Sequence, residues 1–275
     1  MRKEDELMTV ETTPPAAGPL LDGVPISLNH ARTVLTQAIR LHKRSCPLLA
    51  RIVRVSGVPI QRLLDKTGGT HAFLNREAVS LLRTDGLSDL AAYLLQKMDI
   101  LIRGTYWADR GWKNASHHYH PSTRRGLWKW PNAIVESNTH FARALVAWQR
   151  RDENRAIFFL GAALHIIQDL CVPFHARAIV LQGHQRFELW ADQHKHEFGI
   201  QGSTMRGIYR PVAKPEEWIK ANAEMSYEFF PLVARDASEN DYRSAAGELI
   251  PQAIRTSAGF LAAFFELNGR TVRPR

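Results

Sequence analysis

The chain contains only two cysteines, Cys46 and Cys171, in 275 residues, which is too few for a disulfide framework. Cys171 lies in the apolar run LCVPF, where a buried thiol is expected. Long apolar runs are also missing, so no segment is predicted to span a bilayer. The N-terminal residues are charged and then rich in Thr, Pro and Ala, without the apolar core of a signal peptide. Export is therefore not indicated by the sequence as it stands.

Strand patterns are scarce, because alternating Val, Ile and Thr runs are short and helical periodicity dominates. The sequence predicts an all-α protein with one multi-helix domain over residues 26–268. A flexible arm over 1–25 precedes this domain, and a short tail over 269–275 follows it. Residues 106–131, rich in Trp, His, Gly and Pro, are predicted to form a long ordered loop. Helices are predicted over 29–42, 77–104 with a break at 84–86, 138–150, 154–171, 184–197, 215–234 and 242–267.

The charge balance favours anionic partners. The formal net charge is +9, and the isoelectric point is near 9.8. Phosphate esters, acidic membrane surfaces and nucleic acid all satisfy this preference. Charge alone does not choose among them.

Twelve histidines are the most informative feature of the composition. His165 and Asp169 are four residues apart, so a helix projects both from one face, where they can hold one ion. His184 and Glu188 repeat this spacing. A single pair of this kind is more often a surface ion pair. Two pairs on either side of a Pro-terminated turn that carries His175 favour a metal site.

The segment from His165 to Asp169, followed by Pro173 and His175, resembles the zinc-binding signature of the zinc-dependent phospholipases C. Shorter likenesses occur in the same order along the chain, in NHARTVLTQAIRL, GTYWAD, HHYHP and GHQRFE. The resemblance implies an all-α phospholipase C/nuclease-type domain with a zinc cluster in a cleft. Members of this family are usually secreted, whereas no signal peptide is visible here, so the location stays unknown.

The resemblance also implies a ligand set for up to three zinc ions. The first ion falls to Asp109, His117, His165 and Asp169, and the second to His175, His184 and Glu188. Asp169 bridges to a third ion shared with His30. The family completes this third site with a processed N-terminal Trp, but the first Trp here is Trp107. We therefore expect two zinc ions to bind tightly and the third to bind loosely or not at all.

Nitrogen and carboxylate donors without cysteine suit a catalytic zinc site with open positions. Such a site activates water for attack on a phosphodiester. Asp109 is the candidate to orient or deprotonate that water, and plain ligation is its alternative role. The expected reaction cleaves a glycerophospholipid, at a membrane surface, to diacylglycerol and a phosphorylated head group.

Two further functions stay open. A single-strand-specific zinc nuclease acting on nucleic acid has a similar fold, but those enzymes resemble His-x-x-x-Asp where this chain has His184 and Glu188. An inactive relative that only binds metal is the other. No protein partner can be inferred from the sequence.

The remaining histidines receive weaker assignments. His118 and His120 flank His117 and could replace it if the register differs by one. His194 and His196 are expected to face solvent, and no metal role is assigned to His42, His71 and His140. The long loop carries aromatic and basic residues that could pack the loop, meet a membrane interface or stack on bases. They are Trp107, Trp112, Trp128, Trp130, Arg124, Arg125 and Lys129.

Overall fold

The computed structural model describes residues 69–110, 113–128, 130–180, 183–200, 207–210 and 214–269. In these ranges the chain forms helices and connecting segments and contains no strand, which confirms the all-α prediction. The predicted arm, the predicted helix over 29–42 and the C-terminal residues 270–275 lie outside the described residues. The extent of the domain therefore stays a prediction. Among the described helices, none is both long and apolar enough to cross a membrane.

The helices are α4 (Gly69–Thr84), α5 (Ser88–Gln96), α6 (Met98–Asp109), α7 (Ala133–Gln149), α8 (Glu153–Asp169), α9 (Pro173–Ala176), α10 (His184–His194), α11 (Pro215–Glu228) and α12 (Glu239–Leu267). Short 3₁₀ turns occupy Lys113–Ser116, Lys195–Phe198 and Phe230–Leu232.

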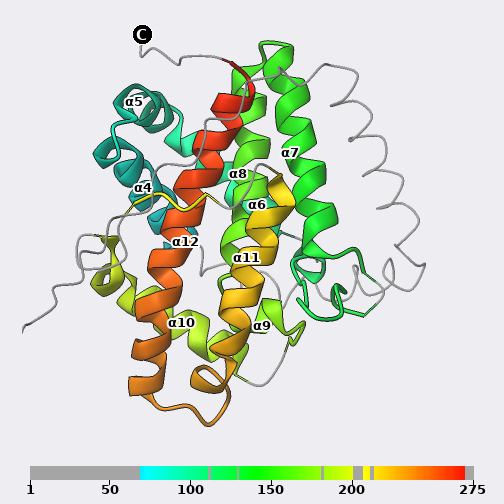
Figure 1. Cartoon of the computed structure of the whole chain (residues 1–275), viewed down its shortest axis with the longest axis vertical. Helices are drawn as coiled ribbons and strands as arrows, with labels where there is room; N and C mark the ends of the chain where they lie inside the picture. Colours follow the sequence, from blue (N-terminus) through cyan, green and yellow to red (C-terminus); the bar gives the residue numbers. More distant parts are fainter. Residues whose placement is uncertain are drawn as a thin grey trace, which may run out of the picture.

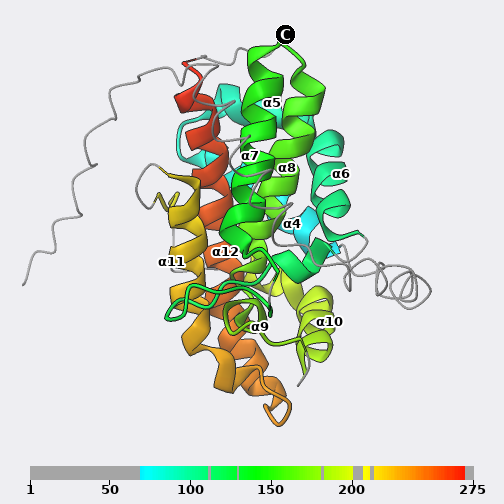
Figure 2. The same cartoon turned by 90° about the vertical axis from the view of Figure 1, so that its right-hand side faces the viewer.

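Helix α8 lies in the middle of the bundle, packed against α6, α7 and α12 (Figures 1 and 2). The side chain of Asp152 caps its start by accepting a hydrogen bond from the backbone N–H of Arg155, at 3.3 Å. From Leu160 to Asp169 every residue of the helix is buried. A helix that is apolar on all sides is a core helix. The polar residues at its C-terminal end are therefore held inside the protein.

Two glycines let α6 and α8 approach each other closely. A Cβ atom built on Gly104 would lie 1.9 Å from the carbonyl oxygen of Phe158, and one on Gly161 would lie 2.1 Å from that of Leu101. Both distances are far below van der Waals contact, so neither position accepts a side chain without moving a helix backbone. This contact sets the distance between α6, which ends at Asp109, and the central helix.

A smaller apolar cluster holds α9 and α10 at one end of the bundle, beside the lower half of α12 in Figure 1. Phe174 of α9, Phe187 of α10 and Tyr242 of α12 are buried there. The N-terminus of α12 is fixed by reciprocal hydrogen bonds between Ser238 and Asp241, which form a capping box. This cluster packs α9 and α10 against the first turns of α12.

Most helix boundaries differ from the predicted ones by a few residues, and three regions also differ in how they are organised. The helix predicted over 77–104 begins already at Gly69 and is divided into α4, α5 and α6. The predicted loop over 106–131 is wrong for 106–109, because Trp107 packs against Phe158 and Phe159 and continues α6 to Asp109. The helices predicted over 184–197 and 215–234 both end in 3₁₀ turns.

The glycine contact predicts a stability difference between two alanine substitutions. Gly161→Ala should lower the free energy of unfolding by about 1–3 kcal/mol or more, because the added methyl group overpacks the α6–α8 interface. Gly247→Ala is the matched control in α12, where a Cβ atom meets nothing nearer than the Phe198 ring at 4.0 Å. That variant should be neutral or stabilised by up to about 1 kcal/mol. Urea unfolding followed by circular dichroism measures both, and equal stability of the two variants would contradict the close approach.

Candidate metal centre

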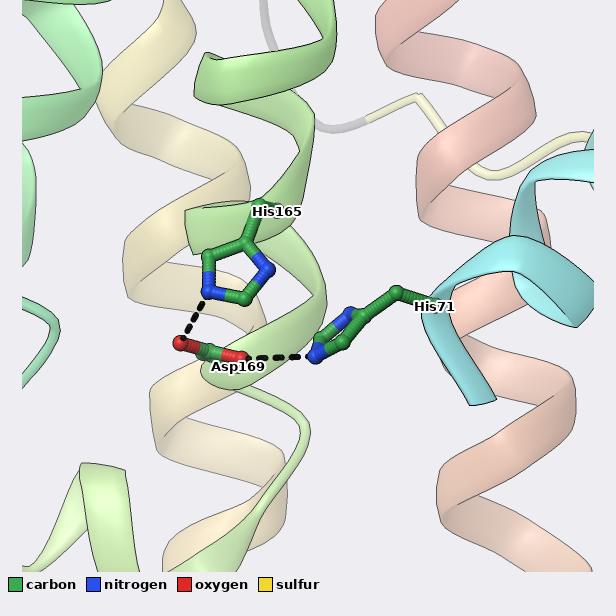
Figure 3. Close-up of side chains that lie close together, drawn as sticks. All are labelled: His71, His165 and Asp169. Carbon is green, nitrogen blue, oxygen red and sulfur yellow. Dashed lines mark ion pairs between the residues drawn. The ribbon is translucent and has the colours of Figure 1, made fainter. Parts of the chain in front are cut away.

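A buried carboxylate, Asp169, lies at the centre of the cluster of histidines. His165 comes from the preceding turn of the same helix, and its Nε2 lies 3.1 Å from Asp169 Oδ2. His117, which follows the 3₁₀ turn after α6, places Nδ1 2.8 Å from the same oxygen. His71 of α4 approaches the other oxygen, with Nε2 3.4 Å from Oδ1. Figure 3 shows His71 and His165 meeting Asp169 from two different helices.

Asp169 is ionised in this environment. Burial by itself raises the pKa of its carboxyl, but the charges of His165 and His175 outweigh burial and hold the pKa well below its ordinary value. A buried carboxylate with three imidazoles around it is an arrangement typical of a metal site.

The Asp109 side chain lies on the solvent side of this cluster. Its Oδ1 is 3.9 Å from His165 Nε2, and the side chain is 48% exposed, whereas that of His165 is 2% exposed. Burial lowers the pKa of His165, but the charges of Asp169 and Asp109 outweigh it and raise the pKa. The ligand atoms of Asp109, His117 and His165 all lie within 4.8 Å of one another, as a shared ion requires. The structure thus brings together the four residues predicted for the first zinc.

A second group of donors lies after the proline turn. His175 is in α9, and His184 and Glu188 lie one turn apart on α10. Glu188 Oε1 is 2.8 Å from His184 Nε2 and 3.7 Å from His175 Nε2. Burial raises the pKa of Glu188, but the charge of His184 and the hydrogen bonds from both histidines lower it overall. The ligand atoms of all three lie within 4.8 Å of one another, so the predicted second set is also brought together.

Local structure explains why α10 starts where it does. Gly183 precedes the helix with φ +105°, in the left-handed region that favours glycine. The ring of Phe174 stacks on that of His184, with centroids 4.9 Å apart. One turn beyond Glu188, Asp192 Oδ1 accepts a hydrogen bond from the Thr70 hydroxyl at 2.8 Å. This bond joins the start of α4 to α10, so the helix that carries His71 is tied to the one that carries Glu188.

The sequence analysis missed His71. Its Nε2 and the donor atoms of His165 and Asp169 form a third group within 4.8 Å of one another. His30, which the resemblance assigned to an ion shared with Asp169, lies outside the described residues and stays a prediction. A signal for His71 was present, because His71 and Asn75 lie four residues apart among the apolar residues of α4. Polar residues at helical spacing on an otherwise apolar helix face indicate a candidate site.

The other histidines fall into two groups. His118 is buried beside His175, with ring centroids 4.7 Å apart, and His140 pairs with Glu136 at 3.2 Å. His194 is partly buried, because its ring stacks on Trp190 and its Nδ1 lies 2.8 Å from that residue's carbonyl oxygen, and its side chain stays 24% exposed. His196 is exposed, as expected.

The donors fit zinc. They are imidazole nitrogens and carboxylate oxygens, which zinc prefers in catalytic sites. Within the described part of the chain, His117 Nε2 and both ring nitrogens of His165 are buried without a hydrogen-bond partner, as expected of a site that receives an ion. Cys171 is buried, and burial raises the pKa of its thiol, so it is not a thiolate ligand.

Known proteins with similar sequences and structures point the same way. A sequence model described as "Zinc dependent phospholipase C" matches residues 70–230. A phospholipase C of Clostridium perfringens is 23% identical over 71% of this chain and 58% of its own length. One from Paraclostridium bifermentans is 24% identical over 74% of this chain and 60% of its own length. The chain thus spans less than two thirds of the length of these curated relatives.

The structure of an alpha toxin from Clostridium absonum superimposes with a TM-score of 0.65, at 18% identity, over 75% of this chain and 66% of the toxin chain. That of the alpha toxin of an avian Clostridium perfringens strain gives 0.63 at 20% identity, over 74% and 65%. These likenesses establish the shared fold. With the family model covering more than half of its residues, the chain belongs to the zinc-dependent phospholipase C family.

Proposed function

We propose that this protein is a zinc-dependent phosphodiesterase that acts as a phospholipase C on glycerophospholipids, releasing diacylglycerol and a phosphorylated head group. The observation that carries the proposal is the pair of donor groups on either side of the α8–α9 turn, one around Asp169 and one around Glu188. The relatives named phospholipase C, matched over about 70% of this chain, support the substrate class.

The chain offers donors for two ions. Asp109, His117 and His165 converge, and Asp169 contacts both of these histidines, so these four residues would hold one zinc. His175, His184 and Glu188 would hold the other. Zinc bound there supplies a Lewis acid that neutralises phosphoryl charge and makes hydroxide available near neutral pH. His71 and Asp169 leave a third position with few protein ligands, so we expect two ions to bind tightly and a third weakly.

Asp109 is the proposed catalytic residue. It combines closeness to His165 with a side chain that is half exposed, whereas the other carboxylate of the cluster, Asp169, is buried. A carboxylate on the accessible side can ligate an ion and also orient the attacking water or accept its proton. In both roles it contacts the reacting groups.

The loop after His117 presents a tryptophan to solvent. Trp128 is 78% exposed and has φ +50°, while its neighbour Leu127 is buried and anchors the loop. The Asn132 side-chain amide donates to the Arg124 carbonyl at 3.0 Å and closes the turn. Arg124 and Arg125 are also exposed. An amphipathic indole beside two guanidinium groups suits the interface of a phospholipid bilayer.

A single-strand-specific nuclease is the alternative, favoured by the net charge of +9. Glu188 disfavours this alternative, because those nucleases resemble His-x-x-x-Asp where this chain has His184 and Glu188. The two functions differ in substrate and share the zinc requirement.

The second donor group predicts the effect of removing Glu188. Glu188→Ala should lose zinc and reduce phosphodiester hydrolysis by about 100-fold or more. Removal of a residue that only orients a metal ligand already lowers metal affinity or activity by about 10- to 100-fold, and Glu188 is itself a proposed ligand. Elemental analysis and turnover measure the two effects. His196→Ala is the control, since His196 is exposed and two turns further along. Full activity with unchanged zinc in the Glu188 variant would remove this residue from the site.

Substrate choice separates the two candidate functions. The zinc-loaded protein should release phosphorylated head group from phosphatidylcholine micelles, and a chelator should stop the reaction because the donors then hold no ion. Single-stranded DNA should stay intact in the same buffer. Degradation of DNA with untouched phospholipid would establish the nuclease instead.

Removal of the exposed indole tests the membrane contact. Trp128→Ala should weaken binding to phospholipid vesicles by about tenfold or more, since burial of a large apolar side chain contributes about 1.5–3 kcal/mol. Hydrolysis of a short-chain, monomeric phospholipid should be unchanged. Leu95→Ala is the control, because Leu95 is an exposed apolar residue of α5, at the opposite end of the bundle (Figure 1). Vesicle sedimentation measures binding, and equal loss in both variants would argue against a specific contact.

A further inference from the structure

Gln168 of α8 has a buried amide that contacts polar side chains of two other helices. Its side chain lies between α8, α4 and α12, and the residue is 2% exposed. Its Oε1 lies 2.8 Å from Nδ1 of His71. Its Nε2 donates to Asn75 Oδ1 at 2.8 Å and to the Ser257 hydroxyl at 3.0 Å. Both ends of the amide therefore have partners.

The hydrogen bonds form one directed chain that begins at a backbone carbonyl. The Thr105 hydroxyl donates to the carbonyl oxygen of Leu101 at 3.0 Å, and a carbonyl can only accept. The hydroxyl oxygen of Thr105 then accepts from Asn75 Nδ2, also at 3.0 Å. Asn75 is left with its oxygen towards Gln168. The amide nitrogen of Gln168 must face that oxygen, so Oε1 is the atom that faces His71.

The orientation of the Gln168 amide determines which nitrogen of His71 carries the proton. An amide oxygen only accepts, so Nδ1 of His71 is the protonated nitrogen. Nε2 then bears a lone pair directed at Asp169 Oδ1, 3.4 Å away. A lone pair and a carboxylate oxygen repel each other unless a cation lies between them. The imidazole is thus prepared to ligate an ion that Asp169 shares.

We propose that Gln168 is a positioning residue that holds His71 in the tautomer and orientation needed to bind a divalent metal ion together with Asp169. The proposal rests on the proposed metal-dependent function. The Gln168 amide does this without adding charge beside Asp169. The same bonds join α4, α8 and α12, so the ligand is held by the core of the bundle.

Three variants test this role by zinc competition titration against a chelating dye. Gln168→Met keeps the length of the side chain and removes the acceptor, so zinc affinity at the weakest site should fall by about 10- to 100-fold. Gln168→Glu keeps an acceptor for the Nδ1–H of His71 while losing the donor to Asn75. It should bind zinc as the unaltered protein does, even where thermal unfolding shows that it is less stable.

Gln252→Met is the matched control. Gln252 is a buried glutamine of α12, 5% exposed, that donates to the buried Asn222 at 3.3 Å and lies outside the metal centre. This variant should unfold at a lower temperature and bind zinc normally.

The outcomes distinguish the two proposals. An unaltered protein that binds no zinc would overturn the metal-dependent function and the role of Gln168 with it. If the unaltered protein binds zinc and Gln168→Met binds it equally well, only the role of Gln168 is overturned. The same conclusion follows if Gln252→Met loses the ion as well, because core damage then explains the loss. Loss in Gln168→Glu as large as in Gln168→Met would exclude the acceptor role.

Discussion

The ionised carboxylate of Asp169 is the group around which the centre is organised. It lies at the end of α8, whose residues are all buried from Leu160 onward, so water cannot stabilise its charge, and histidines from separate parts of the chain do so instead. His117 fixes the segment after α6 relative to α8 through Asp169. His71 is tied to α8 through its contact with Gln168, which fixes α4. The positions of the surrounding elements thus follow from the need to compensate one buried charge.

Close helix packing brings the other candidate ligands to the same place. The glycines of α6 and α8 bring Asp109, at the end of α6, near His165 on the adjacent helix. The proline after α8 ends that helix and starts α9, so that His175 returns towards the same side. Most of the candidate ligands in this bundle are therefore held by helices, whereas Trp128 lies in an exposed loop.

The sequence predicted the features that depend on local spacing. His165 with Asp169 and His184 with Glu188 are one helical turn apart, and periodicity alone places each pair on one face. The all-α class followed from the same periodicity. His71 could not be paired in this way, because its contact with Gln168 joins residues 97 positions apart. The amide network around Gln168 escaped prediction for the same reason, since a buried glutamine looks in sequence like any other polar residue.

The hydrogen bond between Thr70 and Asp192 has a consequence for how the protein matures. It joins residues 122 positions apart, so it cannot form before the chain has been synthesised past Asp192. Contacts at such separation form late, because closing the intervening chain costs entropy before the contact contributes stability. The donors on α4 and α10 are thus still apart while the chain is being made. A fragment that ends before α10 therefore carries an incomplete set of candidate ligands, because His184 and Glu188 lie on that helix.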